Sequence, residues 1–222
     1  MGYRAVALSQ MDGTGSEAIG REAARELGFG YLNEAIIAQV AQDHGMDADT
    51  VAEAERRKSF FLRVAEAAVH MAAGPVPPDP RAYEPDQTDT LLSLIRDTVQ
   101  DAAERGSVVL AAHAACYACA DRLDVLRVGV TAPLPARQSR VASALGITGT
   151  EAARRLRRSD AGRASYLKRV YGVGEESPTD YDVVLNTERL APDAAVGLIL
   201  GLVQARPATP PPDTAPTRSS DG

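Results

Sequence analysis

The chain has 222 residues and a mass of 23.4 kDa, with 45% hydrophobic residues, 24% charged residues, a net charge of −6 and a pI of about 5.2. These values are typical of one globular domain, and the acidic balance argues against a nucleic-acid partner bound through a broad basic surface. No apolar run reaches the roughly 20 residues of a membrane helix and nothing resembles a signal peptide, so we expect a cytoplasmic protein without a membrane partner.

The first predicted unit is a strand, a glycine-bearing loop and a helix. Apolar residues from Tyr3 to Leu8 predict a buried strand, and Ile19, Ala23 and Leu27 follow at helical spacing. The loop between these elements ends in Gly13, Thr14, Gly15 and Ser16. Such a loop directs backbone N–H groups and the positive end of a helix dipole at one point, which predicts a phosphate ligand.

This loop departs from the phosphate-loop pattern G-x-x-x-x-G-K-[ST]. Gly15 is followed by Ser16 and Glu17, so the lysine is absent. Arg21, one helical turn further along the same face, is the nearest replacement for that charge, whereas Glu17 would face bound phosphates unless its side chain turns away. The hydroxyl of Thr14 or Ser16 could hold magnesium, and the sequence assigns neither.

The middle of the chain predicts helices and then strands. Two helices are expected near residues 33–44 and 47–72, before a proline-rich loop at 74–80, and another near 88–106. Residues 108–112 form a continuous apolar run, and residues 125–130 form a second run that is apolar except at Arg127. Such runs are typical of strands buried in a parallel sheet.

The last third predicts a helix, a strand and a helix. Thr148 and Glu151 match a capping box for a helix that ends at Tyr171, residues 183–185 form a third buried run, and Pro192 stands near the start of the last helix. Strands separated by helices predict a three-layer α/β fold with a mostly parallel sheet. We expect one domain over residues 1–206 and a disordered tail over 207–222, which has little to bury.

Ligands of such folds bind at the carboxyl ends of the strands. The loops that follow the predicted strands should therefore converge on one crevice. That would bring residues 13–16 close to His113, to the residues after Thr131, and to Asn186 with Thr187.

The helix near residues 150–171 is dense in positive charge. Its basic residues are Arg154, Arg155, Arg157, Arg158, Arg163, Lys168 and Arg169. Arg154 and Arg158 share a helix face, and such a cluster in an acidic protein predicts an anionic partner. The alternative is a solvated face paired with acidic neighbours such as Asp160.

His113, Cys116 and Cys119 are spaced as H-x-x-C-x-x-C. They could act as three metal ligands or as a redox pair. A structural metal site needs a fourth ligand, and both cysteines fall on one helical face, so we favour packing and assign no metal site.

Four stretches occur together in an order that resembles a known family: residues 9–20, the run into 112–115, residues 158–166 with the pattern D-x-x-R-x-x-Y, and residues 181–187 with Y-D-x-x-x-N-T. Over about residues 3–203 the chain is similar to the cytidylate kinase-like family, a branch of the phosphate-loop nucleoside monophosphate kinases. The resemblance implies a phosphate-loop NTPase-like fold with helical insertions, one that binds the monophosphate and one that forms a lid at about 148–172. It also implies ATP in the loop, Mg²⁺, and a nucleoside monophosphate, CMP first, bound under the helical region after Tyr31.

Further site residues follow from the same resemblance. The lid would supply Arg154, Arg158 and Arg163 to the transferring phosphoryl, while Asp160 orients Arg163 or holds magnesium through water. Arg137 would bind substrate on the adenine side or, with Arg140, serve the lid hinge. His113 stands where relatives have an arginine that meets the monophosphate, and the alternative is a histidine hydrogen-bonded at a strand end.

The missing lysine leaves two interpretations of function. The first is an active kinase that transfers the γ-phosphoryl of ATP to a nucleoside monophosphate. The second is a catalytically impaired protein of the same fold that binds nucleotide or another phosphate-bearing ligand as a sensor or interaction module. A ligand that is not a nucleotide is a third alternative, and the oligomeric state is not predicted.

Overall fold

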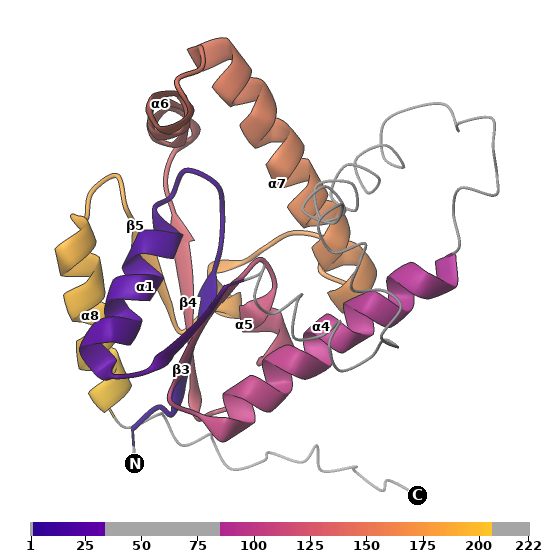
Figure 1. The fold of residues 1–222 in the computed structure, drawn as a ribbon, viewed down its shortest axis with the longest axis vertical. Coiled ribbons are helices and arrows are strands. Elements are labelled where there is room, and N and C mark those ends of the chain that lie inside the picture. Colours follow the sequence, from indigo (N-terminus) through magenta and orange to yellow (C-terminus); the bar gives the residue numbers. More distant parts are fainter. Residues whose placement is uncertain (1, 34–84, 206–222) are drawn as a thin grey trace, which may run out of the picture.

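The computed structural model describes residues 2–33 and 85–205 (Figure 1). Within these ranges, five strands form one parallel sheet in the order β2-β3-β1-β4-β5. The strands are β1 (Ala5–Ser9), β2 (Gly30–Asn33), β3 (Val108–Ala112), β4 (Val125–Thr131) and β5 (Val183–Asn186). The prediction of an α/β fold with a parallel sheet is confirmed.

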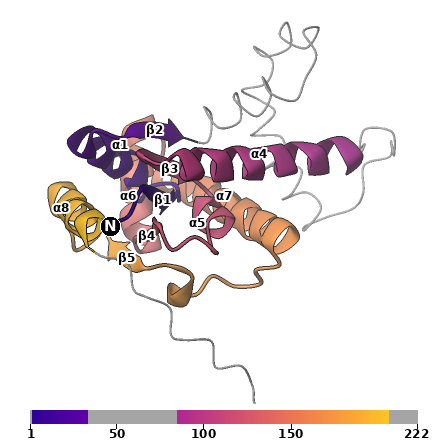
Figure 2. The same ribbon diagram turned by 90° about the horizontal axis from the view of Figure 1, so that it is seen from below.

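Helices cover both faces of the sheet. They are α1 (Ser16–Leu27), α4 (Pro85–Arg105), α5 (Ala115–Ala118), α6 (Leu134–Leu145), α7 (Gly149–Tyr171) and α8 (Pro192–Gln204). Helices α1 and α8 pack on one face, and α4 and α5 on the other (Figure 2). Helix α6 and the start of α7 lie on the side where the strands end, at the top of Figure 1. No described helix has the length and apolar character needed to span a bilayer.

The central strand β1 is buried on both faces. Ala5 and Ala7 join the cluster under α4 and α5, whereas Val6 and Leu8 join the cluster under α1 and α8. Side chains alternate across a strand, so a strand covered on both faces must be apolar throughout. This requirement is why apolar runs predict β1 and β3. Strand β4 follows the same pattern except at Arg127, whose guanidinium pairs with Asp182 at 2.8 Å.

Two strands at the sheet edges differ from expectation. The sequence predicts a buried run at residues 183–185, but β5 pairs with β4 alone, and Val184 is 42% exposed while Leu185 is buried. Strand β2 is not predicted at all, because its residues are exposed or half-buried and carry no apolar run. Asn33, expected to begin a helix, is instead the last residue of this strand. The remainder of that expected helix lies outside the described residues. The same is true of the expected helix at 47–72, the proline-rich loop and the tail.

The arginine-rich helix α7 begins as predicted. The Thr148 hydroxyl accepts from the Glu151 amide at 3.2 Å, and the Glu151 carboxylate accepts from the Thr148 amide at 2.9 Å. This reciprocal pairing confirms the capping box. Val141 of α6 packs with Ala152 and Leu156 of α7, so these two helices share a small core of their own.

Candidate functional site

The loop between β1 and α1 is tightly folded. Gly13 and Gly15 have φ angles of 76° and 80°, the left-handed region that favours glycine. The Thr14 hydroxyl donates to the Met11 carbonyl at 2.7 Å. A Cβ on Gly13 would lie 2.8 Å from the Arg137 carbonyl oxygen. Gly13 is therefore required because the backbone of α6 packs directly against the loop.

Segments that follow β3, β4 and β5 contact the loop after β1. Those after β4 and β5 reach Thr14, as predicted, whereas His113 lies against Gln10, where the loop begins. The Thr187 hydroxyl, after β5, donates to the Thr14 carbonyl at 2.8 Å, and the Thr187 amide donates to the Thr131 carbonyl at 2.9 Å. His113, after β3, places Nδ1 2.6 Å from the Gln10 carbonyl. A carbonyl only accepts, so Nδ1 carries the proton of this hydrogen bond.

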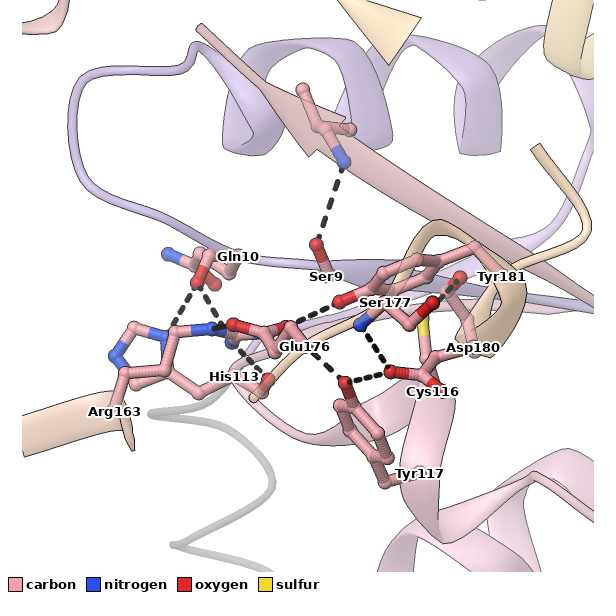
Figure 3. Close-up of polar contacts among 12 residues, drawn as sticks. Ser9, Gln10, His113, Cys116, Tyr117, Arg163, Glu176, Ser177, Asp180 and Tyr181 are labelled. Carbon is pink, nitrogen blue, oxygen red and sulfur yellow. Dashed lines mark hydrogen bonds and ion pairs between the residues drawn. The ribbon is translucent and has the colours of Figure 1, made fainter. Parts of the chain in front are cut away.

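Arg163 of α7 is buried where β1 and β3 end, with 4% of the residue exposed. Its guanidinium donates to both carboxylate oxygens of Glu176, at 2.9 Å and 2.6 Å, and to the carbonyls of Gln10 and His113 (Figure 3). The expectation that Asp160 orients Arg163 is therefore wrong: Glu176, which no sequence motif indicates, holds this position.

Glu176 lies at the centre of a polar network (Figure 3). The hydroxyls of Tyr181 and Tyr117 donate to its carboxylate, and the Tyr117 hydroxyl also lies 3.0 Å from Asp180. Burial acts to raise the pKa of Glu176, but hydrogen bonds from Arg163 and the tyrosines, with the charge of Arg163, outweigh it and lower the pKa. Burial and the neighbouring carboxylate raise the pKa of Tyr181 to about 12.

Asp160 pairs with Arg137 instead. The two carboxylate oxygens accept from Arg137 at 2.6 Å and 3.0 Å, while the remaining guanidinium nitrogen donates to the Asp12 carbonyl at 2.7 Å. Arg137 is 4% exposed, and each of its guanidinium nitrogens contacts protein. This residue joins α6, α7 and the loop, a placement that favours the lid-hinge alternative.

The other arginines predicted for the lid lie elsewhere. Arg154 and Arg158 are on the exposed surface of α7, whereas Arg163 of the same helix reaches the carbonyl of Gln10. Arg21 donates to Glu17 at 2.9 Å and stacks over the Tyr31 ring at 4.8 Å. The Glu17 carboxylate is therefore directed along the outer surface of α1 toward Arg21. A shallow surface groove here is lined by Gly15, Glu17, Ala18, Arg21 and Glu22.

The two cysteines are packed in the core. The Cys116 thiol donates to the Ala7 carbonyl at 3.3 Å, and Cys119 is fully buried. Burial raises the pKa of Cys116 to about 12 and that of Cys119 to about 11. A thiolate is the form that binds metals and reacts, so these environments favour packing over a metal or redox role. The described part of the chain contains no cluster of three potential metal ligands.

The loop and the first turn of α1 fit a phosphate-bearing ligand. The first helical hydrogen bond runs from the Ile19 amide to the Gly15 carbonyl at 3.1 Å, so the amides of Glu17 and Ala18 precede the helical pattern. The Ser16 amide also precedes it and lies 3.4 Å from the Thr14 hydroxyl oxygen. Amides in this position bind anions. Magnesium prefers oxygen ligands, and Thr14 already donates its hydroxyl to Met11, so Ser16 is the loop hydroxyl that fits such an ion.

Comparison with known proteins gives a consistent result. The model of the cytidylate kinase-like family matches residues 5–189. A cytidylate kinase of Methanopyrus kandleri is 26% identical over 203 residues, which covers 87% of this chain and 90% of that protein. A cytidylate kinase of Ignicoccus hospitalis is 34% identical over 101 residues, 46% of this chain and 58% of that protein. An uncharacterized protein from Eubacterium ventriosum shares the fold, with a TM-score of 0.66, 15% identity, and coverage of 91% of this chain and 98% of its own.

Proposed function

Because this chain belongs to the cytidylate kinase-like family, we propose that it transfers the γ-phosphoryl group of ATP to a nucleoside monophosphate, with CMP as the acceptor. The observation that carries this proposal is that the segments after β3, β4 and β5 all contact the loop between β1 and α1. Phosphoryl transfer asks a protein chiefly for positioning and for positive charge around the transferred group. The loop amides would position the phosphates, and Arg163 would supply positive charge once it leaves its pair with Glu176.

The residues divide between the two substrates. Backbone amides of Gly13, Gly15 and the first turn of α1 would hold the triphosphate, since the Thr14 amide already donates to the Met11 carbonyl. Bound Mg²⁺ would neutralise phosphate charge beside Ser16. His113 and Arg163, which meet at the Gln10 carbonyl, would face the phosphate of the acceptor. Arg154 and Arg158 would reach the phosphates only when α7 closes over the site, which would also exclude water.

Three observations favour a second candidate, a nucleotide- or phosphate-binding protein with impaired catalysis. The loop has no lysine, and Arg21, the nearest cation on α1, is paired with Glu17. Arg163 is likewise paired with Glu176. Removal of one preorganised donor from an active site costs on the order of 10²- to 10³-fold in rate. On this proposal the chain acts as a sensor or an interaction module.

One experiment separates the two. The protein is incubated with ATP, Mg²⁺ and a panel of nucleoside monophosphates, and the diphosphate formed is measured alongside the melting temperature with a non-hydrolysable ATP analogue. Turnover of CMP above the other acceptors supports the kinase, whereas a thermal shift without turnover supports the impaired binder. No thermal shift with any nucleotide would contradict both.

A matched negative control comes from the loop itself. Gly13→Ala places a Cβ against the backbone of α6 and strains a residue of positive φ, so it should distort the loop. Its folding is checked by circular dichroism. A folded Gly13→Ala protein that keeps full turnover would show that the activity arises at another site.

A further inference from the structure

Arg140 of α6 lies against the carbonyl groups of the phosphate loop. One terminal nitrogen, NH1, lies 3.1 Å from the Gly13 carbonyl oxygen, 3.4 Å from that of Thr14 and 3.0 Å from the Thr187 hydroxyl. The other, NH2, donates to the Thr187 carbonyl at 2.6 Å. A single guanidinium therefore joins the loop after β1 to the loop after β5.

Thr187 and Arg137 complete this set of contacts. The Thr187 side chain, in a residue only 8% exposed, donates to the Thr14 carbonyl at 2.8 Å. Arg137 donates to the Asp12 carbonyl at 2.7 Å. Three consecutive loop carbonyls, those of residues 12, 13 and 14, thus accept hydrogen bonds from side chains on the α6 side of the loop.

These contacts determine where the loop amides point. The C=O and N–H groups of a trans peptide unit point in opposite directions, and none of the described peptide bonds is cis. The amides of Gly13 and Gly15 therefore point away from α6. Because the α6 backbone packs against Gly13, it blocks the approach of an anion from the α6 side.

Arg140 and Arg137 differ in the kind of oxygen that their guanidinium groups contact. Arg137 is neutralised by its two-pronged pair with Asp160. The contacts of Arg140 described above are with carbonyl and hydroxyl oxygens, which carry no net charge. A positive charge thus lies directly behind the loop, where it makes the loop more attractive to an anion.

We propose that Arg140 and Thr187 are positioning residues that hold the phosphate loop in its anion-binding conformation, and that Arg140 supplies from behind the loop the positive charge that a loop lysine would supply from the front. The ligand class is the polyphosphate of a nucleoside triphosphate. This inference rests on the proposed nucleotide site. Neither residue touches the reacting atoms, so their loss should weaken triphosphate binding and leave acceptor binding unchanged.

The test compares Arg140→Ala, Arg140→Lys and Thr187→Val with wild type. Calorimetry gives the dissociation constants of a magnesium-bound ATP analogue and of inorganic tripolyphosphate. Loss of a hydrogen bond to a charged group corresponds to about a tenfold to hundredfold weaker affinity, which we expect for Arg140→Ala with both probes. Arg140→Lys should recover part of the affinity because it keeps the charge, and Thr187→Val should lose several-fold.

Arg122→Ala is the matched control. Arg122 lies just before β4, at the opposite end of the sheet, and pairs with Asp124 at 2.9 Å. It should bind both probes as wild type does. If turnover is measurable, KM for ATP should rise in the Arg140 variants while KM for the acceptor stays constant. A general loss of structure would change both KM values.

Each outcome bears on one proposal or the other. Wild-type affinity in Arg140→Ala would overturn the positioning role and leave the kinase proposal intact. Binding of tripolyphosphate but not of the ATP analogue, with a loss in Arg140→Ala, would support the positioning role and contradict the kinase. Failure of wild type to bind either probe would contradict both. If Arg140→Ala does not fold, Arg140→Lys and Thr187→Val decide, and unchanged affinity in both would overturn the inference.

Discussion

Arg163 and Glu176 form a two-pronged ion pair between the middle of α7 and the loop that precedes β5, with N–O distances of 2.9 Å and 2.6 Å. The Arg163 side chain is 3% exposed and that of Glu176 is 30% exposed. The arginine that α7 buries is therefore held by a carboxylate of the protein itself. To bind a phosphoryl group directly, Arg163 must give up at least one of its hydrogen bonds to Glu176.

Arg163→Ala should destabilise the protein much more than Arg158→Ala. Breaking one partner of a buried ion pair costs about 3 kcal/mol or more, because the other charge stays behind. Arg158 is exposed, and its loss should change the unfolding free energy by less than about 0.5 kcal/mol. Urea unfolding of the two variants measures the difference. Equal unfolding free energies for the two variants would show that the buried ion pair contributes little. A loss of turnover in Arg158→Ala but not in Arg163→Ala would assign catalysis to the exposed face of α7.

Glu176 should make stability depend on pH in the acid range. Its pKa is lowered by folding from an ordinary value of 4.5, so the ionised form stabilises the native state above that pH. This contribution should disappear as the pH falls through the lowered pKa. The measurement is the unfolding free energy of wild type and Glu176→Gln at neutral pH and well below pH 4.5. Wild type should be more stable by about 2 kcal/mol at neutral pH, and the gap should narrow in acid. A constant gap would mean that Glu176 does not titrate in this range.

Glu17→Gln should strengthen binding of an ATP analogue. Glu17 belongs to the first turn of α1, whose amides would hold the phosphates, and its removal also releases Arg21. A unit charge at contact distance in water is worth about 1 kcal/mol, or roughly fivefold in affinity. The control is Glu26→Gln, in the last turn of α1. Unchanged affinity in Glu17→Gln would indicate that Arg21 already neutralises the carboxylate.

Neither Cys116 nor Cys119 should react with a thiol reagent while the protein is folded. Both are buried, and burial raises both thiol pKa values, so little thiolate forms at neutral pH. Labelling with a chromogenic disulfide should follow the rate of unfolding, and both thiols should react at once in denaturant. Cys119→Ser assigns the signal to one residue. Fast labelling of the native protein would restore the metal or redox interpretation.

The elements that could be predicted from sequence are those with local or periodic causes. The apolar runs at β1 and β3, and the run at β4 that Arg127 interrupts, reveal buried strands because these strands are covered on both faces. Gly13 and Gly15 mark the loop because the backbone there needs positive φ. The capping box of α7 depends only on two residues three positions apart. Strand β2 could not be predicted, because it is a strand through its pairing with β3 and its residues carry no strand pattern of their own.

The amino-acid sequence by itself determined the parallel α/β framework, the glycine loop and the presence of an arginine-rich helix. Only the tertiary structure decided what each arginine does. Arg163 pairs with Glu176, Arg137 pairs with Asp160, and Arg140 reaches a loop 127 positions earlier in the chain. Periodicity tells which face of a helix is apolar, but a charged residue carries no signal of its partner, because that partner is chosen by how distant segments pack.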